Sequence, residues 1–273
     1  MAHVDLHLHS DASDGIVSPT DVVRRAASLG LSGLSLTDHD TVEGLDEAAE
    51  EARLHDLRFL PGAELSANEP NRSVHILAFG IDRRDSGLLA FLRTLQEDRR
   101  RRARQMVEKL RALGVALTYD AVEEQCKRAA PTRAHVARAL VAERLVPDIH
   151  AVFRLYLQRG RPAFVEKLPT PPSLVIDQVH RAGGVALLAH PGRTYGEPEI
   201  TRWRADGLDG VEVLHPANPE DVRRLLASLS RRLGLLRSGG SDWHGPFSDR
   251  SEIGSQKVPL EWMEEIEQRA AAV

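Results

Sequence analysis

The stretch His7-Leu8-His9-Ser10-Asp11-Ala12-Ser13-Asp14-Gly15 lies near the start of the chain, directly after a short apolar segment. The segment 3–7 has the alternation of a strand, and alternate side chains of a strand share a face, so His7 and His9 are expected to point the same way. Two imidazoles at the end of a strand can bind one metal ion, and Asp14 can bind a second. A structural histidine beside a turn aspartate is the alternative, and this short motif alone does not decide between them.

Composition limits the classes of protein to which the chain can belong. Its 273 residues are 42% apolar and 28% charged with a formal net charge of -4, which is typical of a soluble globular protein and not of one that coats nucleic acid. Cys126 is the single cysteine, so any metal must be bound by nitrogen and oxygen atoms, and a reducing compartment suits the chain. Neither a signal-peptide pattern nor an apolar run of membrane-spanning length is found. We expect a cytoplasmic protein that does not contact membranes.

The order of apolar runs and helical patterns predicts an α/β fold. Helical segments separate most of the apolar runs that follow the first strand, as in a parallel sheet or barrel. These runs are Leu31–Leu36, Leu57–Leu65, Val74–Gly80, Val185–Ala189, Gly210–Leu214 and Leu235–Ser238. Between about Leu88 and Phe164 the pattern is helical throughout. We predict a barrel domain formed by residues 1–94 and 165–273, with a helical insertion, residues 95–164, that acts as a lid over the substrate.

Potential metal ligands follow one predicted strand after another. Because the catalytic face of an α/β barrel lies at the carboxyl ends of its strands, these groups are expected to meet at one mouth. So many carboxylates and imidazoles would repel one another and lose hydration unless divalent cations compensated them, so we expect two or three ions. With His7, His9 and Asp14, the candidate ligands are His39, Glu64, His190, Asp242 and His244. His75 lies at the start of the fourth predicted strand, and in a tightly connected barrel it is expected to be close enough to join them.

These residues form motifs that resemble those of the PHP family, the polymerase and histidinol phosphatase superfamily. The motifs are His7-Leu8-His9 with Asp14-Gly15, Thr37-Asp38-His39, Glu64 with His75, Ala189-His190-Pro191 and Ser241-Asp242-Trp243-His244. The resemblance implies a distorted (β/α)7 barrel with a trinuclear metal centre. It assigns His7, His9, Glu64 and Asp242 to the first metal, Glu64, His75 and His190 to the second, and Asp14, His39 and His244 to the third.

Asp14 stands where several family members have histidine. A carboxylate is a harder ligand than imidazole, which favours Mn²⁺ or Mg²⁺ over Zn²⁺ at the third site. We expect Mn²⁺ as the cofactor, with Zn²⁺, iron and Mg²⁺ as alternatives. The catalytic residues are expected to be Glu64, Asp242 and His215, of which His215 would protonate the leaving oxygen.

The predicted insertion and the stretch Pro131–Leu140 resemble stand-alone nucleotide phosphatases of the superfamily. These include enzymes that act on nucleoside 3',5'-bisphosphates, and related 5'-to-3' exoribonucleases. The resemblance implies a phosphohydrolase that converts adenosine 3',5'-bisphosphate to AMP through attack by metal-activated hydroxide. Arg133 opens a helix whose free amides favour anions. The expected substrate-binding residues are Arg133, His135, Lys167, Arg193 and His215.

Several alternatives stay open. The run Arg99–Arg102 with Arg104 is expected to form a solvated helix face, because consecutive charges point around a helix, although it could guide an RNA end. The nearest alternative activity is 5'-to-3' trimming of short RNA that carries a 5'-monophosphate. A histidinol-phosphate phosphatase and a non-catalytic, metal-stabilised interaction module are further alternatives. The expected partner is a small phosphorylated nucleotide or an RNA end, and no obligate protein partner is indicated.

Overall fold

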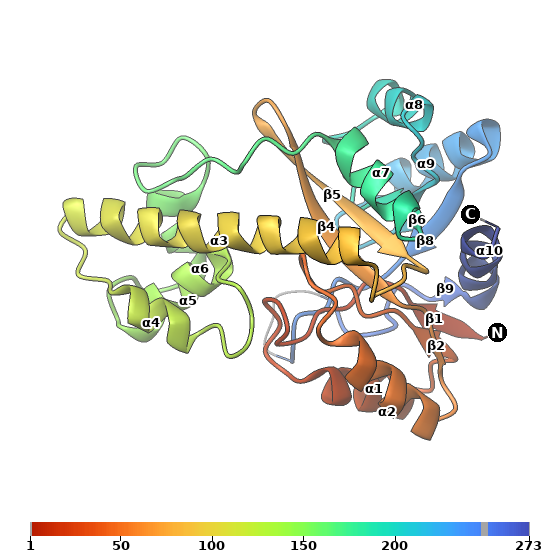
Figure 1. Ribbon diagram of the computed structural model, residues 1–273, viewed down its shortest axis with the longest axis horizontal. Helices are drawn as coiled ribbons and strands as arrows, with labels where there is room; N and C mark the ends of the chain where they lie inside the picture. Colours follow the sequence, from red (N-terminus) through yellow and green to blue (C-terminus); the bar gives the residue numbers. More distant parts are fainter. Residues whose placement is uncertain (1, 247–250, 273) are drawn as a thin grey trace.

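The strands form two sheets in the computed structural model, which describes residues 2–246 and 251–272 (Figure 1). The four-stranded sheet has the order β3-β2-β1-β9, with β1 His3–Asp5, β2 Gly33–Leu34, β3 Arg58–Phe59 and β9 Val258–Pro259. The five-stranded sheet has the order β4-β5-β6-β7-β8, with β4 Gly62–Glu69, β5 Arg72–Phe79, β6 Val185–Leu188, β7 Gly210–Leu214 and β8 Leu236–Gly239. The predicted α/β class is confirmed.

The sheets differ from the predicted parallel barrel in the number of strands, in strand direction and in closure. The run 57–65 contains two strands, since Pro61 has no backbone N–H to continue a ladder between β3 and β4. β5 is antiparallel to both of its neighbours, β4 and β6. Isolated bridges join the sheets, Leu8 with Trp243 and His39 with Glu64, but within the described residues no continuous ladder closes a barrel.

The antiparallel hairpin explains how a histidine at the start of a strand reaches the candidate site. His75 lies early in β5 and pairs with Ser66, which lies beyond Glu64 on β4. In a parallel arrangement the start of β5 would lie at the opposite edge of the sheet. The hairpin therefore brings His75 to the edge where the other candidate ligands lie.

Helices cover the outer faces of both sheets. α1 (Pro19–Ser28) and α2 (Leu45–Leu54) pack on the four-stranded sheet, and α7 (Pro172–Arg181), α8 (Glu197–Ala205) and α9 (Glu220–Leu233) pack on the five-stranded sheet. The start of α1 follows the sequence signal, because the Ser18 side chain accepts a hydrogen bond from the backbone of Asp21. Between the sheets lies an apolar core closed by α10 (Leu260–Ala270), which includes Leu6, Phe79 and Met263.

The segment between β5 and α7 is helical, as predicted. It contains α3 (Ser86–Ala112), α4 (Tyr119–Glu124), α5 (Arg133–Ala142), α6 (Ile149–Val152) and a short π-helix, Phe153–Leu157. In Figure 1 the long helix α3 runs from the sheets to the smaller helices. Leu88 and Leu92 of α3 pack in the core of the five-stranded sheet, whereas Met106 and Leu110 pack in a separate core with α5. The predicted boundary at residue 95 thus falls inside a helix that belongs to both cores.

No helix among the described residues is both long enough and apolar enough to cross a membrane.

Candidate metal centre and the adjoining cation cleft

The segment after β1 carries two candidate ligands and fixes a third. Leu6 and Leu8 are buried in apolar cores, so the alternating His7 and His9 point to the other face, as predicted. The backbone N–H of Asp242 donates to the carbonyl of His7 at 2.9 Å, which places the Asp242 carboxylate beside both rings. This close approach requires Gly240, since a Cβ there would lie 2.4 Å from the Cβ of His7.

Glu64 lies at the centre of the cluster, and its two oxygens face different histidines. Its Oε2 atom lies 3.1–3.2 Å from ring nitrogens of His7, His9 and His39. Its Oε1 atom lies 2.7 Å from His75 Nδ1 and 2.8 Å from His190 Nε2. A carboxylate in this position can bridge two cations.

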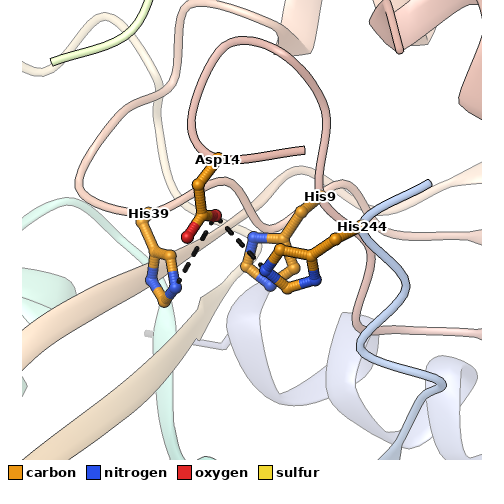
Figure 2. A group of neighbouring side chains, drawn as sticks. All are labelled: His9, Asp14, His39 and His244. Carbon is orange, nitrogen blue, oxygen red and sulfur yellow. Dashed lines mark ion pairs between the residues drawn. The ribbon is translucent and has the colours of Figure 1, made fainter. Parts of the chain in front are cut away.

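Asp14 lies at the edge of the cluster, where His9, His39 and His244 surround it (Figure 2). Its Oδ1 atom lies 3.2 Å from His244 Nε2 and 4.0 Å from His39 Nε2. The ring of His9 stacks on that of His244, with centroids 4.1 Å apart. The loop that delivers Asp14 is held by Asp38, whose carboxylate accepts hydrogen bonds from the hydroxyls of both Ser10 and Ser13.

The donor set fits divalent cations. Among the residues that the structure describes, no hydrogen-bond partner is found for four buried atoms of the cluster, which are both ring nitrogens of His9, Oδ1 of Asp14 and Nδ1 of His39. His7, His9, Glu64 and Asp242 each offer a ligand atom, with all four atoms within 4.8 Å of one another, and His9, Asp14, His39 and His244 do the same. Buried polar atoms without partners are costly, so the atoms of this cluster that lack one favour a cation among them.

The electrostatics of the cluster keep its carboxylates, together with His39 and His75, in the form that binds metal. Burial raises the pKa of Glu64, but the surrounding histidines outweigh it and hold that pKa well below its usual range. Burial lowers the pKa of His75 to about 4 and that of His39 well below its usual value, so both rings are neutral. At His9 burial is outweighed by Asp242 and Glu64, which raise the pKa to about 9, so a cation would compete there with a proton.

A cleft lined by four cations adjoins the metal ligands. Arg99, Arg102, Arg133 and Lys167 line one cavity together with Asp14, His39 and His75. Arg99 and Arg102 are buried, so the expectation of a solvated face for the run 99–102 is wrong at these two positions. Residues three apart share a helix face, and this face of α3 turns toward the cleft, whereas Arg100, Arg101 and Arg104 are exposed.

Two of the four cations lack an acidic partner. Arg99 pairs with Asp40 and Arg102 with Asp98, whereas Arg133 and Lys167 contact no carboxylate within the described ranges. Arg133 lies near the rings of Phe153 and Phe164, at 5.9 and 6.0 Å from their centroids, and Lys167 Nζ donates to the hydroxyl of Ser73 at 2.7 Å. Burial and the neighbouring arginines lower the pKa of Lys167 to about 7. Half-buried cations without counterions attract anions.

The profile of the PHP domain matches residues 5–158, which carry most of the metal cluster and three of the cleft cations. The chain belongs to the PHP family. A 3',5'-nucleoside bisphosphate phosphatase of Chromobacterium violaceum is 38% identical over 93% of this chain and 91% of its own length. A 5'-3' exoribonuclease of Haemophilus influenzae is 36% identical over 89% of this chain and 90% of its own.

A solved structure agrees with these relatives. It is described as a metal-dependent phosphoesterase of Bifidobacterium adolescentis, and it is 34% identical with a TM-score of 0.91, covering 98% of this chain and 96% of its own. This PHP protein is therefore an enzyme of the metal-dependent phosphoesterase class.

Glu212 is a feature of this PHP site that sequence reasoning missed. It is fully buried, and its Oε1 atom lies 2.9 Å from His7 Nδ1. Its Oε2 atom accepts from the backbone N–H of His190 at 2.6 Å. His190 has a φ of +26°, a strained conformation for a residue other than glycine, and this hydrogen bond helps to hold it. The available signal was a carboxylate inside the apolar strand Gly210–Leu214.

The structure brings some of the predicted substrate residues to the site and places others elsewhere. His215 is buried, with its Nε2 atom 3.5 Å from Asp242 and its Nδ1 atom accepting from the backbone of Ala217. His135 caps α5 by accepting a hydrogen bond from the backbone of Thr132, and it lines a different cavity. Arg193 is 68% exposed and pairs with Asp221 on the surface. Neither His135 nor Arg193 lines the cation cleft.

Proposed function

We propose that this PHP protein is a phosphohydrolase that removes the 3'-phosphate from nucleoside 3',5'-bisphosphates, converting adenosine 3',5'-bisphosphate to AMP. The observation that carries the proposal is the pair of cations without acidic partners, Arg133 and Lys167, beside a cluster of metal ligands. One phosphate of the substrate would lie at the cluster and the other at these cations. The relative from Chromobacterium, named for this activity, supports the assignment.

The proposed ligands form three groups around the bridging carboxylate of Glu64. They are His7, His9, Glu64 and Asp242 for the first ion, Glu64, His75 and His190 for the second, and Asp14, His39 and His244 for the third. Two or three divalent ions, with Mn²⁺ the proposed identity, would supply an activated water and neutralise charge on the phosphoryl oxygens. This places Glu64 and Asp242 among the residues on which catalysis depends.

The chain's own side chains would orient the substrate and stabilise the leaving group. Arg133 and Lys167 would bind the 5'-phosphate, with Arg99 and Arg102 adding positive charge behind them. The Nδ1 atom of His215 accepts a hydrogen bond, so the N–H of the ring is at Nε2, which faces Asp242. We assign this Nε2–H as hydrogen-bond donor to the leaving 3'-oxygen, a narrower role than the proton donor predicted from the sequence.

Exonucleolytic cleavage of RNA from a 5'-monophosphate end is the second candidate function. The exoribonuclease from Haemophilus, 36% identical, supports it. Both substrates carry a 5'-phosphate and a phosphorus atom on the 3'-oxygen, so the same cations and metal ligands would serve either one. The difference lies in what else is attached to that phosphorus.

The test offers both substrates to one preparation loaded with Mn²⁺. The panel contains adenosine 3',5'-bisphosphate, a 5'-phosphorylated tetranucleotide, the same tetranucleotide with a 5'-hydroxyl, and histidinol phosphate. We expect the highest kcat/KM on the bisphosphate, and a loss on Arg133→Gln that is absent in the exposed control Arg100→Gln. A higher kcat/KM on the phosphorylated tetranucleotide would replace the proposal with the second candidate. No turnover of any of these substrates would contradict both candidate functions.

A further inference from the structure

A second cavity opens from the cation cleft and shares Arg102, Arg133 and Lys167 with it. It lies between the end of the β4–β5 hairpin and the chain segment that follows the π-helix, and none of the proposed metal ligands lines it. Its volume is about 160 Å³, which is smaller than a typical site for a whole small molecule, so it can hold only a part of a ligand. A ligand whose phosphate rests on the shared cations can therefore extend into this cavity.

The charges beyond the shared cations are balanced. Arg72 pairs with Glu69 and Glu199 at 3.4 and 3.2 Å, and Arg159 pairs with Glu166 at 2.6 Å. A further phosphate would have to displace one of these carboxylates. The cavity thus favours a neutral group over a second anion.

The remaining lining is planar and partly apolar. Phe164 is half-buried, with the guanidinium of Arg159 5.4 Å from its ring centroid, and the neighbouring Val165 is buried. The side-chain amide of Asn68 is occupied, because it donates to the carbonyl of Leu168 and accepts from the backbone of Thr170. Aromatic rings and guanidinium planes stack on nucleobases with little regard to base identity.

We propose that this cavity is the nucleobase subsite, with Phe164 as its stacking platform. The inference rests on the proposed function, because it assumes that the 5'-phosphate of a nucleotide lies on Arg133 and Lys167. Asn68 and the charged groups beyond the shared cations already have partners, and the side-chain oxygen of Asn71 accepts from Arg159 at 2.8 Å. Stacking, more than hydrogen bonding to the base edge, therefore provides the recognition. The enzyme therefore accepts purine and pyrimidine nucleotides alike and discriminates against phosphates that lack a base.

Calorimetric binding to the Mn²⁺-loaded protein tests this subsite without requiring turnover. The probes are AMP, CMP and ribose 5-phosphate, which share the 5'-phosphate and differ in the base. AMP is expected to bind about 5- to 100-fold more tightly than ribose 5-phosphate, the range that stacking of one base provides. Phe164→Leu, which keeps apolar bulk but removes the ring, brings AMP close to ribose 5-phosphate, whereas Phe164→Trp preserves the difference. The matched control is Leu155→Ala, at an exposed apolar position of the same subdomain.

The outcomes separate the subsite from the proposed function. Equal binding of AMP and ribose 5-phosphate to the unmodified protein overturns the subsite, even if bisphosphates are hydrolysed. The same conclusion follows if Phe164→Leu weakens both probes equally. If the binding pattern holds but no bisphosphate is hydrolysed, the proposed function fails and the base subsite stands.

Discussion

Replacing Glu212 with glutamine should weaken metal binding while the metal ligands themselves are unchanged. The two oxygens of Glu212 serve different donors, the Nδ1 atom of His7 and the backbone N–H of His190. Burial raises the pKa of Glu212, but His7 and His215 outweigh it and lower that pKa, so the side chain is a carboxylate that accepts from both donors. Glutamine keeps the shape but has one oxygen, so its amide N–H₂ group must face one of the two donors.

Either orientation of the glutamine disturbs a proposed ligand. If the amide group faces His7, the ring must move its proton to Nε2, the atom that lies 3.1 Å from Glu64 and would bind metal. If the amide group faces His190, two donors meet at a residue that is already strained. Partners of metal-binding histidines typically account for about 10- to 100-fold in metal affinity, which corresponds to about 1.4–2.7 kcal/mol. We expect a loss of this size for the ion bound by His7 or His190.

The assay equilibrates metal-free protein at graded free Mn²⁺ concentrations and measures bound manganese by mass spectrometry. Asp209→Asn is the matched control. The Asp209 carboxylate also accepts from a histidine ring and from a backbone N–H, those of His180 at 2.7 Å and Ala186 at 2.9 Å. It lies outside the metal cluster. The control should bind Mn²⁺ like the unmodified protein. If the Glu212→Gln isotherm overlays that of the control, Glu212 does not position the ligands and the reasoning is refuted.

Three further predictions concern the cleft, the leaving group and the ions. Raising the pH through about 7 removes the proton of Lys167, so the Ki of AMP should rise above pH 7 by up to about tenfold per pH unit. Lys167→Arg should flatten this pH profile. If the variant has the same profile as the unmodified protein, Lys167 does not bind the phosphate. His215→Ala should lower kcat about 10²- to 10³-fold, the typical effect of removing a hydrogen-bond donor to the reacting oxygen, and should leave the manganese content unchanged. A reduced manganese content would instead show that His215 belongs to the metal site. Removing metal with a chelator should lower the Tm by about 5–10 °C, because ions present at a hundred times their Kd contribute about 2.7 kcal/mol to the free energy of unfolding. Adding Mn²⁺ should restore the Tm. Equal Tm values with and without Mn²⁺ would contradict a cluster that binds ions in the folded state.

The proximity of most candidate ligands could be predicted because they lie in short motifs at the ends of apolar runs. The alternation of side chains along a strand predicted that His7 and His9 share a face. The rule that the carboxyl ends of strands meet at one edge predicted that His39, His190 and Asp242 lie near them. That rule does not place His75, which is brought to the same edge by an antiparallel hairpin that no local signal in the sequence distinguished from a parallel pair. The joining of two sheets through single bridges, in place of a closed ladder, likewise depends on long-range pairing.

Arg99 and Arg102 show a different limit of sequence reasoning. A run of arginines has the same composition whether it faces water or a cleft, and its orientation is decided by what α3 packs against. Leu92 and Leu95 precede the run on α3 and Ala103 and Met106 follow, and all four are buried. Helical periodicity from these apolar positions would have placed Arg99 and Arg102 on the buried side.

The metal cluster and the cation cleft are held at a fixed spacing by the loop that carries His39. Asp40, the next residue, accepts from the backbone N–H of Ser66 at 2.6 Å and from Arg99 Nε at 2.6 Å, and its own N–H donates to the carbonyl of Glu64. One buried residue, Asp40, therefore connects Glu64, the neighbouring His39 and the helix that carries two of the cleft cations. Because α3 is tied at this point and also packs in the core of the insertion, a movement of the smaller helices would be resisted at the metal cluster. The proposed substrate, with its two phosphates separated by one ribose, is suited to a site in which this distance is set by buried contacts.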